Sequence, residues 1–317
     1  MATSTRKVTF DEFFRALFNE KGEQWTPTDL RDDHDRKEAL KQKMDKFINE
    51  LESSQFYHDF RDEVQGSHIS EHIRWFLVSE SKMRIVIYGI GSIESDEKHS
   101  PTLQLGLALL MKKDFGWIEG IELFDPILSK TEIQVLESLG CSVSYLNEYG
   151  RRKVLKPTMF FMPHCDIRLY NNLLEENWKP ELLSNIIIFG NSFDSYIKHP
   201  PDVSKIFHTN DPRIRKLGIW ALMGNILASQ TFTSEFKMRT ISYDRHKIGQ
   251  DASFQRDCDI SFFNLSWHFF SSLTRRRMRL VRENTRNEYG ASVGLRSRIV
   301  VRQKKENVAT SNTSLEE

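Results

Sequence analysis

Two glycines, Gly89 and Gly91, stand directly after a nonpolar stretch at residues 84–88, and Ser92 follows them. A nonpolar strand that ends in Gly-x-Gly is typical of nucleotide-binding α/β domains, because glycine lets the backbone come close to a ligand. In dinucleotide-binding domains a helix begins at this turn, and its N-terminus holds the pyrophosphate. Here residues 92–99 come first and carry three acidic side chains, which would repel phosphate. The acidic side chains therefore argue against a polyphosphate more strongly than against a less negatively charged cofactor, such as the adenosyl cofactor S-adenosylmethionine. The pattern does not by itself identify a ligand.

Other polar residues follow the nonpolar stretches in the middle of the chain. Ligands of parallel sheets bind beyond the carboxyl ends of the strands, so these residues are candidates for a ligand site. Together with the glycine turn, the set is Gly89, Gly91, Ser92, Asp125, Asn147, Glu148, His164, Cys165, Asn191 and Ser192. Loops at strand ends are polar in any α/β domain, so the same set also fits ordinary loops. Asp125 could bind a ribose hydroxyl, but Asp-Pro also opens ordinary turns.

The segment Met162-Pro-His-Cys-Asp166 places a histidine beside a cysteine, just before an expected helix. A cysteine at a helix N-terminus tends to have a lowered pKa, and a neighbouring histidine can lower it further, so Cys165 is a candidate reactive thiol. His164 or Cys165 could also be an axial ligand of haem. No Cys-x-x-Cys or His-x₃-His accompanies them, which argues against zinc. The alternative is a hydrogen-bonded loop histidine next to a half-buried thiol.

Basic residues are concentrated near the C-terminus. From Thr274 onward the chain has 11 Lys and Arg against 5 Asp and Glu, whereas the remainder has 34 against 39. This segment could bind nucleic acid or a nuclear-import receptor, or it could have no specific partner. No aromatic residues are interleaved to form a base-stacking platform. The residues of this candidate patch are Arg275, Arg276, Arg277 and Arg279.

Hydrophobic patterning predicts strands and helices in alternation from residue 84 to residue 189, with a capping box at Ser129 and a helix cap at Asp166. This order is typical of an α/β fold, Rossmann-like, with a mostly parallel sheet flanked by helices. One link is unusual, because only about eleven residues separate the third and fourth strands. That link is either a minimal crossover or a sign that one strand is antiparallel. The expected strands are 84–88, 118–124, 142–146, 158–162 and 185–189, and the expected helices include 102–113 and 129–139.

The rest of the chain divides into three parts. Residues 1–80 are expected to be an N-terminal helical extension, with helices at 11–20 and 35–53. Residues 81–273 would form the Rossmann-like domain, including a helix at 214–229 and an aromatic strand at 262–270 that belongs to the core or anchors a partner. Residues 274–317 would be a basic tail that is largely disordered beyond about residue 285.

Composition narrows the class of protein further. The chain has no run of eighteen apolar residues, so no membrane span is expected. Its N-terminus has no apolar segment typical of a secretory signal. Three cysteines form no disulfide framework and fit a reducing compartment. The sequence therefore predicts a soluble intracellular protein.

Several segments together resemble the sensitivity-to-red-light-reduced family over roughly residues 70–272. The segments that carry the resemblance are Tyr88-Gly-Ile-Gly-Ser-Ile-Glu-Ser95, Gln104-Leu-Gly-Leu-Ala-Leu-Leu110, Phe124-Asp-Pro126, Pro157-Thr-Met-Phe-Phe-Met-Pro-His-Cys165, Leu169-Tyr170, Asn177-Trp178, Gly190-Asn-Ser-Phe-Asp-Ser-Tyr196 and Phe263-Asn-Leu-Ser-Trp-His-Phe-Phe270. The resemblance implies a plant-type regulator of phytochrome B red-light signalling and of the circadian clock, found in nucleus and cytoplasm. Animal and fungal relatives are linked to haem metabolism and to the cytoskeleton.

The resemblance supplies no catalytic residues, and the stretch 200–260 matches the family poorly. Two hypotheses follow. In the first, the protein is a non-enzymatic regulator that acts mainly through protein partners in light or clock signalling. In the second, it is an enzyme or cofactor sensor whose ligand, haem or an adenosyl cofactor, lies over Gly89–Ser92 and His164–Cys165.

Overall fold

The computed structural model describes residues 22–78, 80–95, 100–202, 212–238, 250–271 and 274–288. The helix predicted at residues 11–20 lies outside these ranges. All described residues belong to one compact unit, residues 21–292.

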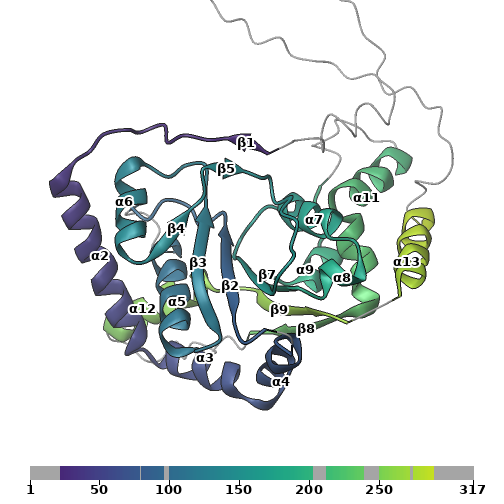
Figure 1. The fold of residues 1–317 in the computed structure, drawn as a ribbon, viewed down its shortest axis with the longest axis horizontal. Helices are drawn as coiled ribbons and strands as arrows, with labels where there is room; N and C mark the ends of the chain where they lie inside the picture. Colours follow the sequence, from purple (N-terminus) through teal and green to yellow (C-terminus); the bar gives the residue numbers. More distant parts are fainter. Residues whose placement is uncertain are drawn as a thin grey trace, which may run out of the picture. The chain divides into compact units, whose positions relative to one another are not determined.

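The centre of this unit is a seven-stranded sheet with the strand order β4-β3-β2-β6-β7-β9-β8 (Figure 1). The first five strands in this order are parallel, β9 is antiparallel to β7, and β8 is antiparallel to β9. The mostly parallel, Rossmann-like sheet predicted from the sequence is therefore confirmed. The strands are β2 (Met83–Tyr88), β3 (Ile118–Phe124), β4 (Cys141–Val143), β6 (Thr158–Met162), β7 (Ile186–Asn191), β8 (Thr233–Lys237) and β9 (Leu265–Phe270).

The short link between the third and fourth predicted strands is a parallel crossover without a helix. Strand β4 ends at Val143, so residues 144–157 are available to pass from one side of β2 to the other, which meets the dozen or so residues that a crossover needs. Within this link β5 (Leu146–Asn147) pairs with β1 (Glu23–Gln24) in a separate two-stranded sheet. The alternative of an antiparallel strand at this link is wrong.

A buried side chain, Asn177, holds this crossover in place. Its Oδ1 accepts the backbone N–H of Val154 at 2.8 Å, and its Nδ2 donates to the carbonyl of Arg152 at 2.7 Å. The side chain thus supplies backbone hydrogen bonds that a crossover helix would otherwise make internally.

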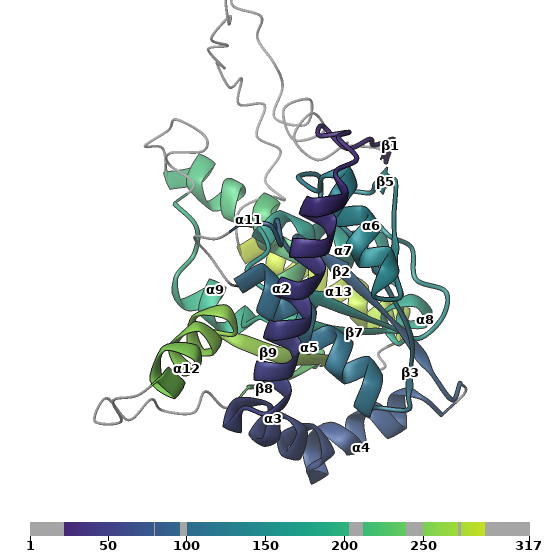
Figure 2. The same cartoon turned by 90° about the vertical axis from the view of Figure 1, so that its left-hand side faces the viewer.

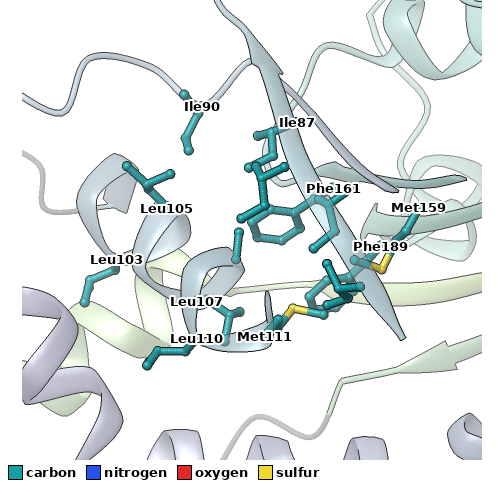
Figure 3. Packing of buried hydrophobic residues seen from close by; sticks show 14 of the residues in the cluster. Ile87, Ile90, Leu103, Leu105, Leu107, Leu110, Met111, Met159, Phe161 and Phe189 are labelled. Carbon is teal, nitrogen blue, oxygen red and sulfur yellow. The ribbon is translucent and has the colours of Figure 1, made fainter. Parts of the chain in front are cut away.

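One face of the sheet carries the larger core, where apolar side chains of α5 meet Ile87, Phe161 and Phe189 (Figure 3). Helix α2 lies outside α5, farther from the sheet in Figure 1, and runs down the front in Figure 2. The predicted capping box at Ser129 is present at the start of α6. The helices that contribute to this side are α2 (His34–Glu52), α3 (Gln55–Gln65), α4 (Ser67–Phe76), α5 (Ser100–Asp114), α6 (Lys130–Ser138) and α12 (Gln250–Ser261).

Helices α2, α3 and α4 contribute Leu40, Phe60 and Ile73 to the same core as the strands. The boundary predicted at residue 80 stays a prediction. None of the helices that the structure describes is long and apolar enough to cross a membrane.

A second group of helices lies on the opposite side of the sheet from α5 (Figure 1). Here α11 packs on both α7 and α13. The group consists of α7 (Ile167–Glu176), α8 (Pro180–Leu183), α9 (Phe193–Lys198), α11 (Pro212–Ser229) and α13 (Arg275–Glu288), with a 3-10 turn, η1 (Gln230–Phe232), after α11. Helix α13 forms the first part of the predicted basic tail, and its Met278 is buried. The disorder predicted beyond about residue 285 stays a prediction. Residues 289–317 lie outside the described ranges.

Candidate functional site

The strand order reverses between β2 and β6, and this switch point is where open α/β sheets bind ligands. The carboxyl end of β2 leads into Gly89–Ser92, and that of β6 into His164 and Cys165. Asn191 ends the adjacent strand β7. Candidate residues predicted from segments up to about a hundred positions apart in the sequence thus lie at the same edge of the sheet.

Asp125 is almost fully buried and binds the backbone of two turns. One carboxylate oxygen accepts the N–H of Gly91 at 2.8 Å, and the other accepts the N–H of Ile127 at 3.0 Å. Gly91 has a φ of 85°, a conformation that glycine adopts without strain. Asp125 therefore fixes the glycine turn, and it does not present a free carboxylate at the strand end.

Ser92 is bound to the start of helix α6. Its hydroxyl donates to Oε1 of Glu132 at 2.7 Å, and the same oxygen accepts the N–H of Ile93 at 2.8 Å. The other oxygen of Glu132 accepts the N–H of Ser129, which completes the capping box. One glutamate therefore joins the glycine loop to α6.

Cys165 is buried against the end of β2. Its Sγ donates to the carbonyl of Tyr88 at 3.0 Å. Burial, with further contributions from Asp125 and Asp166, raises the pKa of this thiol well above its ordinary value. The lowered pKa predicted from its place before α7 is therefore wrong, because desolvation and nearby acidic groups outweigh the helix N-terminus.

Cys165 also fills the space where a side chain at Gly89 would lie. A Cβ placed on Gly89 would lie 2.8 Å from the Sγ of Cys165, and Gly89 has a φ of 65°. The close approach that the glycine permits is thus used by a side chain of the protein itself.

His164 and Asn191 form a second connection across the strand ends. The backbone N–H of His164, which has a φ of 54°, donates to Oδ1 of Asn191 at 2.7 Å. The exposed imidazole places Nε2 3.0 Å from the carbonyl of Ser261. The thiol of Cys165 donates to the carbonyl of Tyr88, whereas the imidazole of His164 faces the carbonyl of Ser261. His164 and Cys165 therefore do not form a nucleophile–base pair.

Ser192 belongs to a buried polar network farther along the sheet. It caps helix α9, and its hydroxyl donates to Glu235 of β8. His268 of β9 is fully buried, with Nε2 3.1 Å from the carbonyl of Asn191 and Nδ1 4.0 Å from Glu235. Burial lowers the pKa of His268 to about 4 despite the nearby glutamate. Sequence analysis did not identify Glu235 or His268 as parts of this network.

The two remaining candidates also make internal contacts. Glu148 accepts the hydroxyl of Tyr88 at 2.6 Å and the guanidinium of Arg152 at 2.7 Å. Asn147 accepts the N–H of Tyr149 at 3.1 Å. Both residues therefore stabilise the crossover that leads to β6.

These contacts fit a haem ligand set poorly. The thiol of Cys165 faces a backbone carbonyl with its pKa raised, and the Nε2 of His164 faces another carbonyl. Within the described ranges, no three His, Cys, Asp or Glu side chains could hold a metal ion together. An adenosyl cofactor would have to share Asp125 with two backbone N–H groups that already occupy both oxygens.

The basic patch predicted at the start of α13 lines a groove elsewhere on the molecule. The groove has a cavity volume of about 670 Å³ and lies between α13, α11 and the segment before α8. Arg275 and Arg279 of the predicted patch line it, together with two tryptophans that the sequence did not connect with it. We call this the Arg/Trp groove, lined by Trp178, Lys179, Pro180, Trp220, Arg275, Met278, Arg279, Arg282, Glu283 and Arg286.

The sheet and its glycine turn define a Rossmann-like α/β protein. The family model of the SRR1 domain matches residues 29–269. The chain therefore belongs to the SRR1-domain family, as its sequence motifs indicated.

Two relatives illustrate the range of this similarity. The chain is 44% identical over 250 residues to Protein SENSITIVITY TO RED LIGHT REDUCED 1 of Arabidopsis thaliana. The matched region covers 78% of this chain and 80% of that protein. It is 37% identical over 148 residues to an SRR1-like protein of Mus musculus, covering 44% of this chain and 55% of that protein.

The solved structures that this chain resembles include two methyltransferases of low similarity. The plantazolicin methyltransferase BpumL, solved with SAH, is 10% identical, covers 75% of this chain and 100% of that one, and has a TM-score of 0.28. Phosphoethanolamine N-methyltransferase 2 of Haemonchus contortus is 13% identical, covers 72% of this chain and 60% of that one, and has a TM-score of 0.25.

Proposed function

We propose that this chain is a regulatory protein in red-light signalling and circadian clock control, which acts mainly through protein partners in nucleus and cytoplasm. The single observation that carries the proposal is its 44% identity to the Arabidopsis protein over four fifths of that protein's length. Membership of the SRR1-domain family supports a regulatory role in general. The name of that relative supports the red-light assignment, and the family resemblance supports the clock assignment.

The strand-end geometry supports a regulator more than a ligand-dependent enzyme. Asp125, Ser92 and Cys165 each make hydrogen bonds to other parts of the sheet edge. A catalytic site needs groups positioned toward a substrate, with a base within hydrogen-bond reach of a nucleophile. The strand-end groups are instead positioned toward one another.

Complementation tests this proposal. The full chain would be expressed, as a fluorescent fusion, in Arabidopsis plants that lack Protein SENSITIVITY TO RED LIGHT REDUCED 1. We expect restored seedling responses to red light and a restored clock period, with fluorescence in both nucleus and cytoplasm. Accumulation of the fusion without any restored response would contradict the proposed role.

A Gly91→Val variant separates the regulator from the cofactor hypothesis. Gly91 has a positive φ and lies near Pro101, so valine strains the turn. A regulator loses complementation only in proportion to the loss of folded protein. Loss of complementation at an unchanged level of folded protein would contradict the regulator and favour a ligand over the turn.

A second candidate function is the binding of an adenosyl cofactor or haem, because the glycine turn lies at the switch point of the sheet. Thermal unfolding tests it directly. The full chain would be melted with haemin, S-adenosylmethionine, NAD and ATP. A specific ligand at a hundredfold excess over its dissociation constant stabilises the folded state by about 2.7 kcal/mol. We expect no shift, and a shift that His164→Ala abolishes would replace the regulator with a cofactor-dependent protein.

A further inference from the structure

Four arginines of α13 line the same wall of the Arg/Trp groove. Arg275, Arg279, Arg282 and Arg286 follow one another at intervals of four, three and four residues. This spacing places them in one row along a helix. Eleven residues of helix span about 16 Å along its axis, which gives the length of the row.

Two tryptophans also line the groove. Trp178, just before α8, and Trp220, on α11, both line the cavity and are half-buried. The guanidinium of Arg282 lies over the ring of Trp178, 5.6 Å from its centroid. An aromatic face beside a row of cations is thus assembled from three segments that lie far apart in the sequence.

The charge of the groove is only partly neutralised. Arg275 pairs with Glu181 at 2.9 Å, and Arg282 pairs with Glu175. Among the side chains that the structure describes, Lys179, Arg279 and Arg286 form no ion pair. Glu283 is the acidic residue that lines the groove beside them. The groove therefore favours an anion.

Size and lining identify the kind of anion. A cavity of about 670 Å³ has the volume of sites that enclose a small organic ligand, larger than one phosphate needs. A stacked nucleic-acid strand has one phosphate per about 3.4 Å of helix axis, so a row of about 16 Å runs alongside several phosphates. A phosphopeptide with one phosphate would engage one end of this row and would not require tryptophans.

We propose that the Arg/Trp groove binds single-stranded nucleic acid, with a base stacked on tryptophan and the backbone along the arginine row. Single strands expose base faces that stack on aromatic side chains, and arginines bind the adjacent phosphates. A duplex keeps its base faces covered. The groove therefore discriminates by strandedness, and its binding weakens as salt concentration rises.

Fluorescence anisotropy with the full chain tests the proposal. The probe is a labelled RNA or DNA of about 12 nucleotides, within the site sizes of single-strand-binding folds, at about 50 mM salt. Its competitors are the same sequence as a duplex, an abasic strand of equal charge, AMP, and a peptide with one phosphoserine. We expect the base-containing strand to bind about tenfold more tightly than the abasic strand.

Two double variants locate the site. Arg279→Ala/Arg286→Ala removes two groove cations without an ion-pair partner, whereas Arg276→Ala/Arg277→Ala removes two exposed arginines of α13 outside the groove lining. We expect the first to lose about tenfold in affinity and to flatten the slope of log K against log salt by about 1.4. The second should change affinity by less than about twofold.

A stacking variant, Trp178→Leu, should bind base-containing and abasic strands equally, and its thermal unfolding shows whether it folds. If it does not fold, the wild-type comparison of the two strands still decides the role of the bases. Equal binding of duplex, abasic strand or phosphopeptide by the wild-type protein would overturn the proposal. So would equal losses in the two double variants, or no binding at low salt.

Discussion

The strand ends and the Arg/Trp groove both gather polar side chains, but they use them differently. At the strand ends, Asp125 and Glu132 satisfy backbone N–H groups and join neighbouring loops. In the groove, Arg279 and Arg286 are exposed and lack ion-pair partners among the described side chains. Polar side chains that bind each other stabilise a fold, whereas unpaired cations beside aromatic rings are available to a ligand.

Asp125→Ala should have the largest effect on stability. It leaves the buried N–H groups of Gly91 and Ile127 without their acceptor, which costs about 3 kcal/mol of unfolding free energy. Urea denaturation measures the change, with Asp45→Ala on the exposed face of α2 as control. A loss below about 1 kcal/mol would mean that Asp125 is available to a ligand.

The buried His268 should make the fold sensitive to acid. Its pKa is lowered to about 4 from an ordinary 6.5, so between these values the unfolded chain binds more protons than the folded chain. Its contribution is therefore complete above about pH 6.5 and falls by up to about 3 kcal/mol as the pH drops to 4.

Urea denaturation across this pH range measures the acid sensitivity. His268→Gln should flatten the acid-side slope, whereas His164→Gln, which alters an exposed histidine, should preserve it. An unchanged slope in His268→Gln would show that protonation of His268 does not govern the acid side.

Gly89→Ala should cost about 2 kcal/mol, because alanine strains a positive φ and its Cβ meets the Sγ of Cys165. In a Cys165→Ala background the contact with Sγ is absent. There Gly89→Ala should cost only its backbone strain, about 1 kcal/mol of unfolding free energy. A double-mutant cycle in urea gives the coupling. Strict additivity would show that the cysteine does not fill the space beside the glycine.

Ser92→Ala should have a smaller effect, about 1 kcal/mol, because Glu132 keeps its bonds to Ile93 and Ser129. The same urea experiment detects it. A loss as large as that of Asp125→Ala would mean that the serine, rather than the glutamate, holds the loop.

Arg279→Ala/Arg286→Ala should have the smallest effect on stability, within about 0.5 kcal/mol. Both side chains are exposed on α13. A larger loss would make these arginines structural and remove the contrast between the two regions.

Local sequence signals predicted most of the fold. Nonpolar runs gave β3 and β6 with their observed bounds, and the capping box and the cap at Asp166 marked two helix starts. The crossover after β4 was harder, because Asn177, a residue some twenty positions away, supplies its hydrogen bonds.

The properties of the two polar regions depended on contacts that spacing does not encode. Cys165 was expected to be reactive because its neighbours in sequence are His164 and a helix start, whereas its neighbours in space are Tyr88 and Asp125. The groove escaped notice because Trp178 and Trp220 meet α13 only in the folded chain. Helix α13 was itself obscured, since its arginines outnumber the apolar residues that mark a helix face.

The most direct test of the contrast measures single-strand affinity for one variant of each region under identical conditions. Arg279→Ala/Arg286→Ala should bind the labelled strand about tenfold more weakly than the wild-type protein. Ser92→Ala should bind it within about twofold, since it alters only the strand-end network. The reverse pattern, with affinity lost in Ser92→Ala and retained in the groove variant, would contradict the account.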